Sequence, residues 1–271
     1  MVKSLTGIDK IEYLTRQLKR MGKIALAFSG GVDSTFLLAL AKRAGPEKLL
    51  AITVASQFFT KEENLLTKKL ANDMGVDHVC LDLDILGEAQ VVQNTPQRCY
   101  FCKTQIFSLV RETAVKHEID NLLHAVNVDD LGDYRPGLEA AKELGFMAPL
   151  VEAGFSKKEI RECSRQMGLE TWRLPSQSCL ATRIPYNDLI TQEKLGMIDQ
   201  GESFLRKLGF SDFRVRCHGN VARIEMDPDA FSSLMDEDTR RMISRGLKKI
   251  GFEYVACDLD GYKTGNMNKF K

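Results

Sequence analysis

A short polar turn near the start of the chain has the residue types and the spacing of a phosphate site. Ser29-Gly30-Gly31-Val32-Asp33-Ser34 lies between the apolar run 24–28 and the apolar-periodic run 33–44. Glycines in such a turn let the backbone approach a ligand, and the N–H groups that begin the following helix attract anions. The alternative is an ordinary turn in which Asp33 or Ser34 caps the helix. The candidate phosphate ligands are Ser29, Gly30, Gly31, Asp33 and Ser34.

This turn differs from the G-x-x-x-x-G-K-[ST] loop of kinases and GTPases, because no lysine follows its second glycine. S-G-G-V-D-S at the end of a first strand resembles instead the PP-loop of N-type ATP pyrophosphatases. That resemblance implies cleavage of ATP between its α- and β-phosphates, with AMP transferred to an oxygen of the substrate. The loop would hold the departing pyrophosphate and stabilise its developing charge.

Cysteines form the second chemical feature. There are seven, an odd number at uneven spacing, which is typical of thiols, metal ligands or catalytic groups rather than of a disulfide framework. Cys99 and Cys102 form a C-x-x-C just before a predicted helix at 103–117, and Cys179 follows in the Pro- and Ser-rich loop 174–188. A C-x-x-C can be a redox pair, half of a zinc site or a pair of cluster ligands. Buried structural thiols are the remaining alternative.

A metal site built on these cysteines would need a third ligand, because the chain has no second C-x-x-C. Cys179 could complete a three-cysteine set with Cys99 and Cys102. Three thiolates on a 4Fe–4S cluster would leave one iron open to bind an extra sulfur.

Elements that position these residues alternate between strand and helix, which predicts an α/β fold with a parallel sheet covered on both faces. The predicted strands are 24–28, 49–56, 77–84, 121–127 and a short 146–152; the predicted helices are 8–21, 33–44, 61–75, 103–117, 137–145 and 156–168. From about residue 190 the pattern changes to helix 191–208, strands 213–219 and 221–226, helix 229–247 and strand 252–259. These elements predict a second, smaller α+β domain.

Composition narrows the class of protein. The 271 residues carry a net charge of +1, so no global basic field indicates nucleic acid. No apolar run approaches the roughly 18 residues that span a bilayer, and the N-terminus does not resemble a signal peptide. We therefore expect a cytoplasmic protein with no membrane partner and no nucleic-acid partner.

Several longer motifs together resemble the LarE family of PP-loop sulfur transferases. They are "AFSGGVDSTFLLALA", "RCYFCK", "AVNVDDLGDYRPGLEAAKELG", "CLATRIPY" and "RVRCHGNVARIE", of which "DDLGDYRPG" and "CLATRIP" are the most specific. The resemblance implies a PP-loop domain over 1–185, with a fold like that of the adenine nucleotide alpha hydrolases. It also implies a C-terminal α+β domain over 190–262, which would bind the substrate phosphate and take part in oligomerisation.

The family resemblance implies a reaction in which ATP and Mg²⁺ activate a carboxylate of pyridinium-3,5-biscarboxylic acid mononucleotide as its adenylate. Sulfur then replaces AMP to give the thiocarboxylate, and two rounds lead toward the nickel-pincer nucleotide. In single-cysteine members the residue matching Cys179 surrenders its own sulfur and becomes dehydroalanine. In three-cysteine members a 4Fe–4S cluster carries sulfur from a sulfide or persulfide donor, and Cys99, Cys102 and Cys179 match that type.

The resemblance also assigns roles by position. Cys179, Asp130 and Lys103 would be catalytic, and Arg183, Arg214 and Arg216 would bind the substrate phosphate. Each has a structural alternative: Lys103 as a solvated helix start, Asp129 and Asp130 as turn residues, and Arg183 paired with an acid of its own loop. Arg214 and Arg216 could equally form the solvent face of a strand. Asp133 to Arg135 precede Pro136, so helix capping explains part of that motif. The family further implies a homo-oligomer.

Other readings of the sequence remain open. A tRNA thiolation enzyme also joins a PP-loop to cysteines, but it would need a basic or zinc-bound RNA-binding appendage. A glutamine-dependent amidating synthetase would need a glutaminase domain, for which the length leaves no room. A non-catalytic nucleotide or iron–sulfur module is the alternative from another class, and release of pyrophosphate would distinguish it from an enzyme.

Overall fold

The computed structural model describes residues 7–132, 136–175 and 178–263. The chain divides into two compact units, Met1–Asp84 with Cys99–Gln177, and Ile85–Arg98 with Ser178–Lys271. The first unit holds a four-stranded sheet in the order β3-β2-β1-β4, and the second holds a three-stranded sheet in the order β5-β6-β7. The predicted α/β class with a smaller α+β part is confirmed. The division into functional domains at 1–185 and 190–262 stays a prediction.

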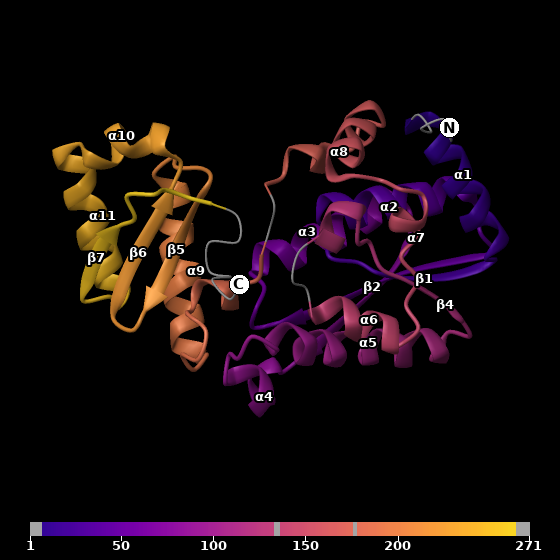
Figure 1. Cartoon of the computed structure of the whole chain (residues 1–271), viewed down its shortest axis with the longest axis horizontal. Coiled ribbons are helices and arrows are strands. Elements are labelled where there is room, and N and C mark those ends of the chain that lie inside the picture. Colours follow the sequence, from indigo (N-terminus) through magenta and orange to yellow (C-terminus); the bar gives the residue numbers. More distant parts are fainter. Residues whose placement is uncertain (1–6, 133–135, 176–177, 264–271) are drawn as a thin grey trace. The chain divides into compact units, whose positions relative to one another are not determined.

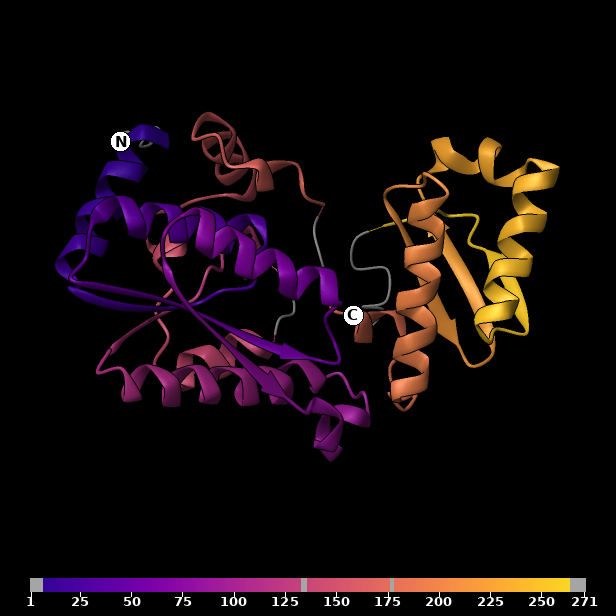
Figure 2. The same ribbon diagram turned by 180° about the vertical axis from the view of Figure 1, so that it is seen from behind.

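The first unit alternates strands and helices as predicted. Its strands are β1 (Lys23–Ala27), β2 (Lys48–Ser56), β3 (Asp77–Leu83) and β4 (Asn121–Leu123). Its helices are α1 (Gly7–Arg20), α2 (Val32–Ala44), α3 (Lys61–Asp73), α5 (Arg98–Lys116), α6 (Pro136–Glu143), α7 (Pro149–Glu152) and α8 (Lys157–Gln166), with the 3₁₀ turns η2 (Val128–Gly132) and η3 (Glu170–Arg173). Helices cover both faces of the sheet, with α5 and α6 on one side and α1, α2, α3 and α8 on the other (Figures 1 and 2).

Parallel pairing fixes where the connecting loops emerge. β1 pairs in parallel with β2 on one side and with β4 on the other, in register Ile24 with Asn121 through Leu26 with Leu123. The carboxyl ends of β1 and β4 therefore lie side by side, and ligands bind at that edge of open parallel sheets. The core beneath this edge consists of apolar side chains of β1, α2 and α8, among them Leu26, Phe36 and Ile160, each fully buried.

Three sequence predictions for individual elements are wrong. Residues 146–152 do not form a strand: only Met147 bridges to Leu123, and Pro149 begins the short helix α7 because proline lacks a ladder donor and suits a first helical position. The predicted helix 229–247 is broken at Asp236, whose carboxylate accepts from the Thr239 N–H and starts a new helix. α5 begins at Arg98 and not at 103, so the C-x-x-C lies inside the first turns of the helix.

The second unit combines the C-terminal elements with a segment from the first half of the chain, Ile85–Arg98, called here the excursion. Its elements are η1 (Ile85–Gly87), α4 (Ala89–Val92), η4 (Leu180–Arg183), α9 (Gln192–Lys207), β5 (Phe213–His218), β6 (Val221–Met226), η5 (Pro228–Ala230), α10 (Phe231–Met235), α11 (Glu237–Ile250) and β7 (Tyr254–Cys257). β5 and β6 are antiparallel, and β7 returns parallel to β6 after the α10–α11 crossover. None of the helices in the described residues is long and apolar enough to cross a bilayer.

Asn94 attaches the excursion to the segment that follows Cys179. This fully buried residue, with φ 54°, donates from Nδ2 to the carbonyl oxygens of Ile184, Pro185 and Asp188, at 3.3, 2.7 and 3.1 Å. Its Oδ1 accepts from the Arg98 guanidinium. One amide side chain therefore binds three backbone carbonyls of a loop, which are not paired within a β-sheet.

We expect Asn94→Ala to destabilise the second unit by about 2–4 kcal/mol, because it removes the donor that binds the loop carbonyls and one of the acceptors of the Arg98 guanidinium. Urea unfolding followed by circular dichroism measures the change. Asn187→Ala is the matched control, since Asn187 also has a positive φ but an exposed side chain. Equal losses for the two variants would contradict the assigned role of the Asn94 amide.

Candidate active site

The turn between β1 and α2 has the geometry of an anion site. Gly30 adopts φ +71°, and a Cβ there would lie 3.0 Å from Thr67 Cγ2. Gly31 is the N-cap of α2 and no side chain caps the helix, so the alternative of Asp33 or Ser34 as N-cap is wrong. Ser34 Oγ lies 3.1 Å from Ser29 Oγ and donates to the Gly31 carbonyl at 3.2 Å. The first N–H groups of α2 are thereby left for a ligand.

Lys157 bridges this turn to the loop after β4. Its ammonium lies 2.6 Å from Asp33 Oδ2, and its backbone N–H donates to Asp129 Oδ2 at 2.7 Å. A capping box fixes Lys157 as the first residue of α8: Ser156 Oγ accepts from the Glu159 N–H, and the Glu159 carboxylate accepts from the Ser156 N–H. Three separate segments of the first unit thus meet at one point.

Asp130 lies beside this ion pair and is partly a turn residue, as the structural alternative expected. Its Oδ2 accepts from the Asn127 N–H at 3.1 Å, while the Asn127 side-chain oxygen accepts from the Asp129 N–H at 2.9 Å. The pKa of Asp33 is raised above the usual aspartate value by burial and by the Asp130 charge, against the opposing effects of Lys157 and Asn127. Two carboxylates and one ammonium therefore share the edge of the sheet where the phosphate turn emerges.

Lys103 projects from α5 over an aromatic cluster. Its ammonium lies 5.5 Å from the centre of the Phe107 ring, which contacts the rings of Phe146 and His124. Burial, with a smaller effect of Lys103, lowers the pKa of His124 to about 4. His124 is therefore neutral at pH 7 and adds no second positive charge beside Lys103. The alternative of Lys103 as a solvated helix start does not fit, because α5 starts five residues earlier.

Cys99 and Cys102 are three residues apart in α5, so their side chains share one face of the helix. Cys102 is buried and Cys99 half-buried, and none of the seven cysteines, all of which lie in described residues, forms a disulfide. A Cβ on Gly137, in the first turn of α6, would lie 3.3 Å from the Cys99 carbonyl and 2.8 Å from Lys103 Cγ. This contact packs α6 tightly against the turn of α5 that carries the thiols.

Cys179 belongs to the second unit, where Arg183 organises its surroundings. The Arg183 Nη1 atom donates to the Ser178 carbonyl, the Ser178 hydroxyl and the Thr182 hydroxyl at 2.7, 2.7 and 2.9 Å, and to the Cys179 carbonyl at 3.2 Å. Its Nε and Nη2 atoms bind both oxygens of Glu202, at 2.9 and 3.2 Å. Arg183 therefore pairs with an acid of α9, and the expectation of an acid in its own loop is wrong.

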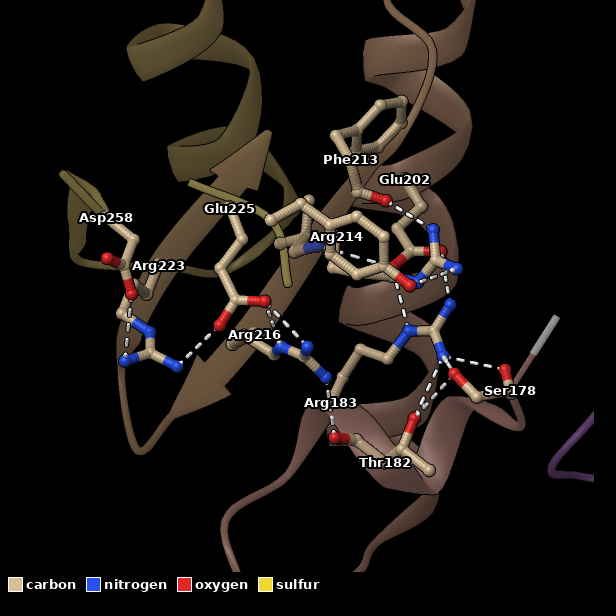
Figure 3. Close-up of polar contacts among 12 residues, drawn as sticks. Ser178, Thr182, Arg183, Glu202, Phe213, Arg214, Arg216, Arg223, Glu225 and Asp258 are labelled. Carbon is tan, nitrogen blue, oxygen red and sulfur yellow. Dashed lines mark hydrogen bonds and ion pairs between the residues drawn. The ribbon is translucent and has the colours of Figure 1, made fainter. Parts of the chain in front are cut away.

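Arg214 and Arg216 continue a buried ionic network on β5 (Figure 3). Only 8% and 5% of these two residues is exposed, so they do not form the solvent face of a strand. Arg216 donates twice to Glu225, at 2.9 and 2.6 Å, and once to the Thr182 carbonyl at 2.9 Å. Arg214 stacks 4.7 Å from the Tyr262 ring and donates to the Phe213 carbonyl.

A fourth arginine joins this network. Arg223 donates to Glu225 at 2.8 Å and lies 3.3 Å from Asp258 (Figure 3). Burial, together with the neighbouring Arg183, lowers the pKa of Arg214.

The structure brings together some predicted site residues and leaves others in separate units. Ser29 to Ser34, Asp130, Lys103, Cys99 and Cys102 are in the first unit, while Cys179, Arg183, Arg214 and Arg216 are in the second. No group of three or more His, Cys, Asp or Glu arranged to hold a metal occurs within the described parts of the chain. Sequence analysis missed Lys157; its signal was the capping box, which fixes the lysine at a helix start. Asp133 to Arg135 lie outside the described residues.

Comparisons with known proteins identify the family of this chain. Residues 12–119 match the asparagine synthase family. Over 94% of this chain and 92% of the relative, the sequence is 33% identical to pyridinium-3,5-bisthiocarboxylic acid mononucleotide synthase of Lactiplantibacillus plantarum. The chain belongs to the LarE family. Uncharacterized proteins of Synechocystis sp. and Methanocaldococcus jannaschii are 35% and 31% identical over 96% of the chain, covering 97% and 98% of those proteins.

Membership of the LarE family makes the turn after β1 a PP-loop and the chain an ATP-dependent sulfurtransferase. The PP-loop prediction and the family prediction made from the motifs are confirmed. The individual site residues, the sulfur source and the cluster are not tested by these comparisons.

We expect Gly30→Ala and Gly31→Ala to separate backbone strain from ligand approach. Gly30→Ala should lower the free energy of unfolding by about 1–2 kcal/mol, because its φ is positive and Thr67 crowds the new methyl group. Gly31→Ala should change it by less than about 0.5 kcal/mol, since Gly31 has φ −73° and only an ordinary contact at 3.5 Å. Both should weaken ATP binding, measured by calorimetry; unchanged ATP affinity in both variants would count against the PP-loop as the phosphate site.

Proposed function

We propose that this protein adenylates a carboxylate of pyridinium-3,5-biscarboxylic acid mononucleotide and replaces AMP by sulfur, giving the thiocarboxylate of nickel-pincer nucleotide biosynthesis. The supporting observation is the 33% identity to pyridinium-3,5-bisthiocarboxylic acid mononucleotide synthase over nearly the whole of both chains. The reaction consists of two displacements. A carboxylate oxygen attacks the α-phosphorus of ATP and pyrophosphate leaves; a sulfur nucleophile then attacks the acyl carbon and AMP leaves.

The first displacement is assigned to the edge of the sheet in the first unit. N–H groups of Ser29 to Ser34 at the start of α2 would hold the pyrophosphate as it departs. Mg²⁺, bound together with ATP, supplies charge neutralisation of the phosphates, and the carboxylates of Asp33 and Asp130 are the oxygen donors it prefers. Lys157, 2.6 Å from Asp33, would keep that carboxylate ionised and oriented. Lys103 would hold the adenylate.

Substrate phosphate is assigned to Arg183, Arg214 and Arg216 of the second unit. The three guanidinium groups are buried close together, and burial together with the charges of Arg183 and Arg216 lowers the pKa of Arg214, which supports this assignment. A dianionic phosphate would offset this repulsion, and the planar guanidinium groups suit bidentate binding. Glu202 and Glu225 hold two of these arginines in fixed orientations, so the anion would meet a preorganised site.

The delivery of sulfur is assigned to Cys99, Cys102 and Cys179. We propose that these three cysteines hold a 4Fe–4S cluster. The donor chemistry fits, because the three residues are thiols and two of them share one face of α5. A contact within the second unit supports the third ligand: Arg98, the residue before Cys99, donates to the carbonyl of Ala181, two residues after Cys179. When bound, the cluster would supply an open iron for an extra sulfur and spare Cys179 from conversion to dehydroalanine.

We expect pyrophosphate and AMP to be released when the protein is incubated with ATP, Mg²⁺ and the biscarboxylic acid mononucleotide. Lys157→Ala should lower the rate of pyrophosphate release about a hundredfold, because it removes the cation that pairs with Asp33. Lys157→Arg should restore part of the rate. Lys158→Ala, which changes the adjacent exposed lysine, is the matched control and should leave the rate within about twofold. No pyrophosphate from the unaltered protein would refute the proposed substrate.

We expect anaerobically purified protein to be brown and to contain iron and acid-labile sulfide. Cys99→Ala should lose both, whereas Cys80→Ala, on β3, should retain them. Mass spectrometry after repeated turnover should find Cys179 unchanged. A colourless protein with stoichiometric zinc, or loss of the mass of H₂S at Cys179, would contradict the cluster.

A further inference from the structure

A basic pocket of the first unit is lined by residues of α8 and η3 that the proposed reaction does not use. Its volume is about 420 Å³. The residues that line it are Lys158, Arg161, Glu162, Arg165, Trp172 and Arg173. Four of these six side chains are cationic and one is anionic.

Arg161 makes the pocket a fixed structure. Its two terminal nitrogens donate to the carbonyl oxygens of Trp172 and Leu174, the latter at 2.7 Å. These bonds attach η3 to α8. The backbone of η3 is therefore held by a half-buried guanidinium group and not by loop packing alone.

Two arginine side chains lie over the ring of Trp172, which is the single tryptophan of the chain. The centres of the Arg165 and Arg173 guanidinium groups lie 5.8 and 5.1 Å from the centre of its ring. A guanidinium stacked on an aromatic ring keeps its N–H edge directed outward, where it can bind a carboxylate with two hydrogen bonds.

The positive charges are also spread along the helix. Lys158 and Arg165 are seven residues apart on α8, which corresponds to about 10 Å. A single small anion cannot reach both ends of such a stripe, whereas acidic side chains of an extended peptide repeat about every 7 Å on one face. Glu162, 3.7 Å from Arg165, is the one carboxylate among the lining residues.

We propose that the face of Lys158, Arg165, Trp172 and Arg173 binds an acidic polypeptide segment of a partner protein. Carboxylates of the segment would pair with Arg165 and Arg173 at the rim of the indole and with Lys158 about two helical turns away. This inference does not require the proposed sulfur transfer, and its test can fail or succeed separately from that activity.

The test uses the full-length protein and a hexaglutamate peptide as the probe. Binding is followed by the fluorescence of Trp172, the only tryptophan, and independently by calorimetry. We expect saturable binding of hexaglutamate that weakens about tenfold or more at high salt. Arg165→Gln combined with Arg173→Gln should weaken binding by a further factor of about ten. Arg111→Gln, an exposed arginine of α5, is the matched control and should bind the peptide as the unaltered protein does.

Other probes decide between classes of partner. Hexaglutamine, of the same length without charge, should not bind. Tighter binding of a thymidine hexanucleotide or of inorganic pyrophosphate than of hexaglutamate would overturn the proposal, because the ligand would then be a nucleic acid or a small phosphate. Absence of saturable hexaglutamate binding at low salt, or equal affinity of the double variant and the unaltered protein, would also overturn it.

Discussion

The parallel pairing of β1 with β4 is the constraint on which the edge of the sheet that carries the PP-loop depends. It places the PP-loop after β1 beside the segment Asn127–Asp130 after β4, although about a hundred residues separate them in sequence. Lys157 completes the junction from a third segment, and its ion pair with Asp33 joins the starts of α2 and α8. A parallel sheet exposes its strand ends together, so a few loop residues can form a phosphate site above a fully apolar core.

The second unit depends on ion pairs that are buried within it. Its sheet holds Arg214 and Arg216 almost wholly buried, with Glu225 paired to Arg216 and Glu202 paired to the neighbouring Arg183. Breaking such pairs is costly, because it leaves an ion buried without a partner. Through Arg183, the same network reaches the carbonyl of Cys179.

Local signals in the sequence were sufficient where neighbouring residues decide the structure. The capping box of Ser156 and Glu159, the buried run of β1 and the glycine turn at 29–34 each depend on residues within one or two helical turns. Predictions from these signals were wrong where two local signals in one segment favoured different structures. Asp236 capped a new helix in the middle of a predicted one, and Pro149 began a helix in a predicted strand.

The sequence by itself determined the alternation of strand and helix, the PP-loop and the family, because these reside in short motifs and in periodicity. Only the tertiary structure decided that Arg214 and Arg216 are buried, that Arg183 pairs with Glu202, and that Lys157 reaches Asp33. It also decided that Ile85–Arg98 joins the second unit through the bonds of Asn94. Ion pairs and buried amides depend on which distant segments meet, and no local pattern records the partner of a charge.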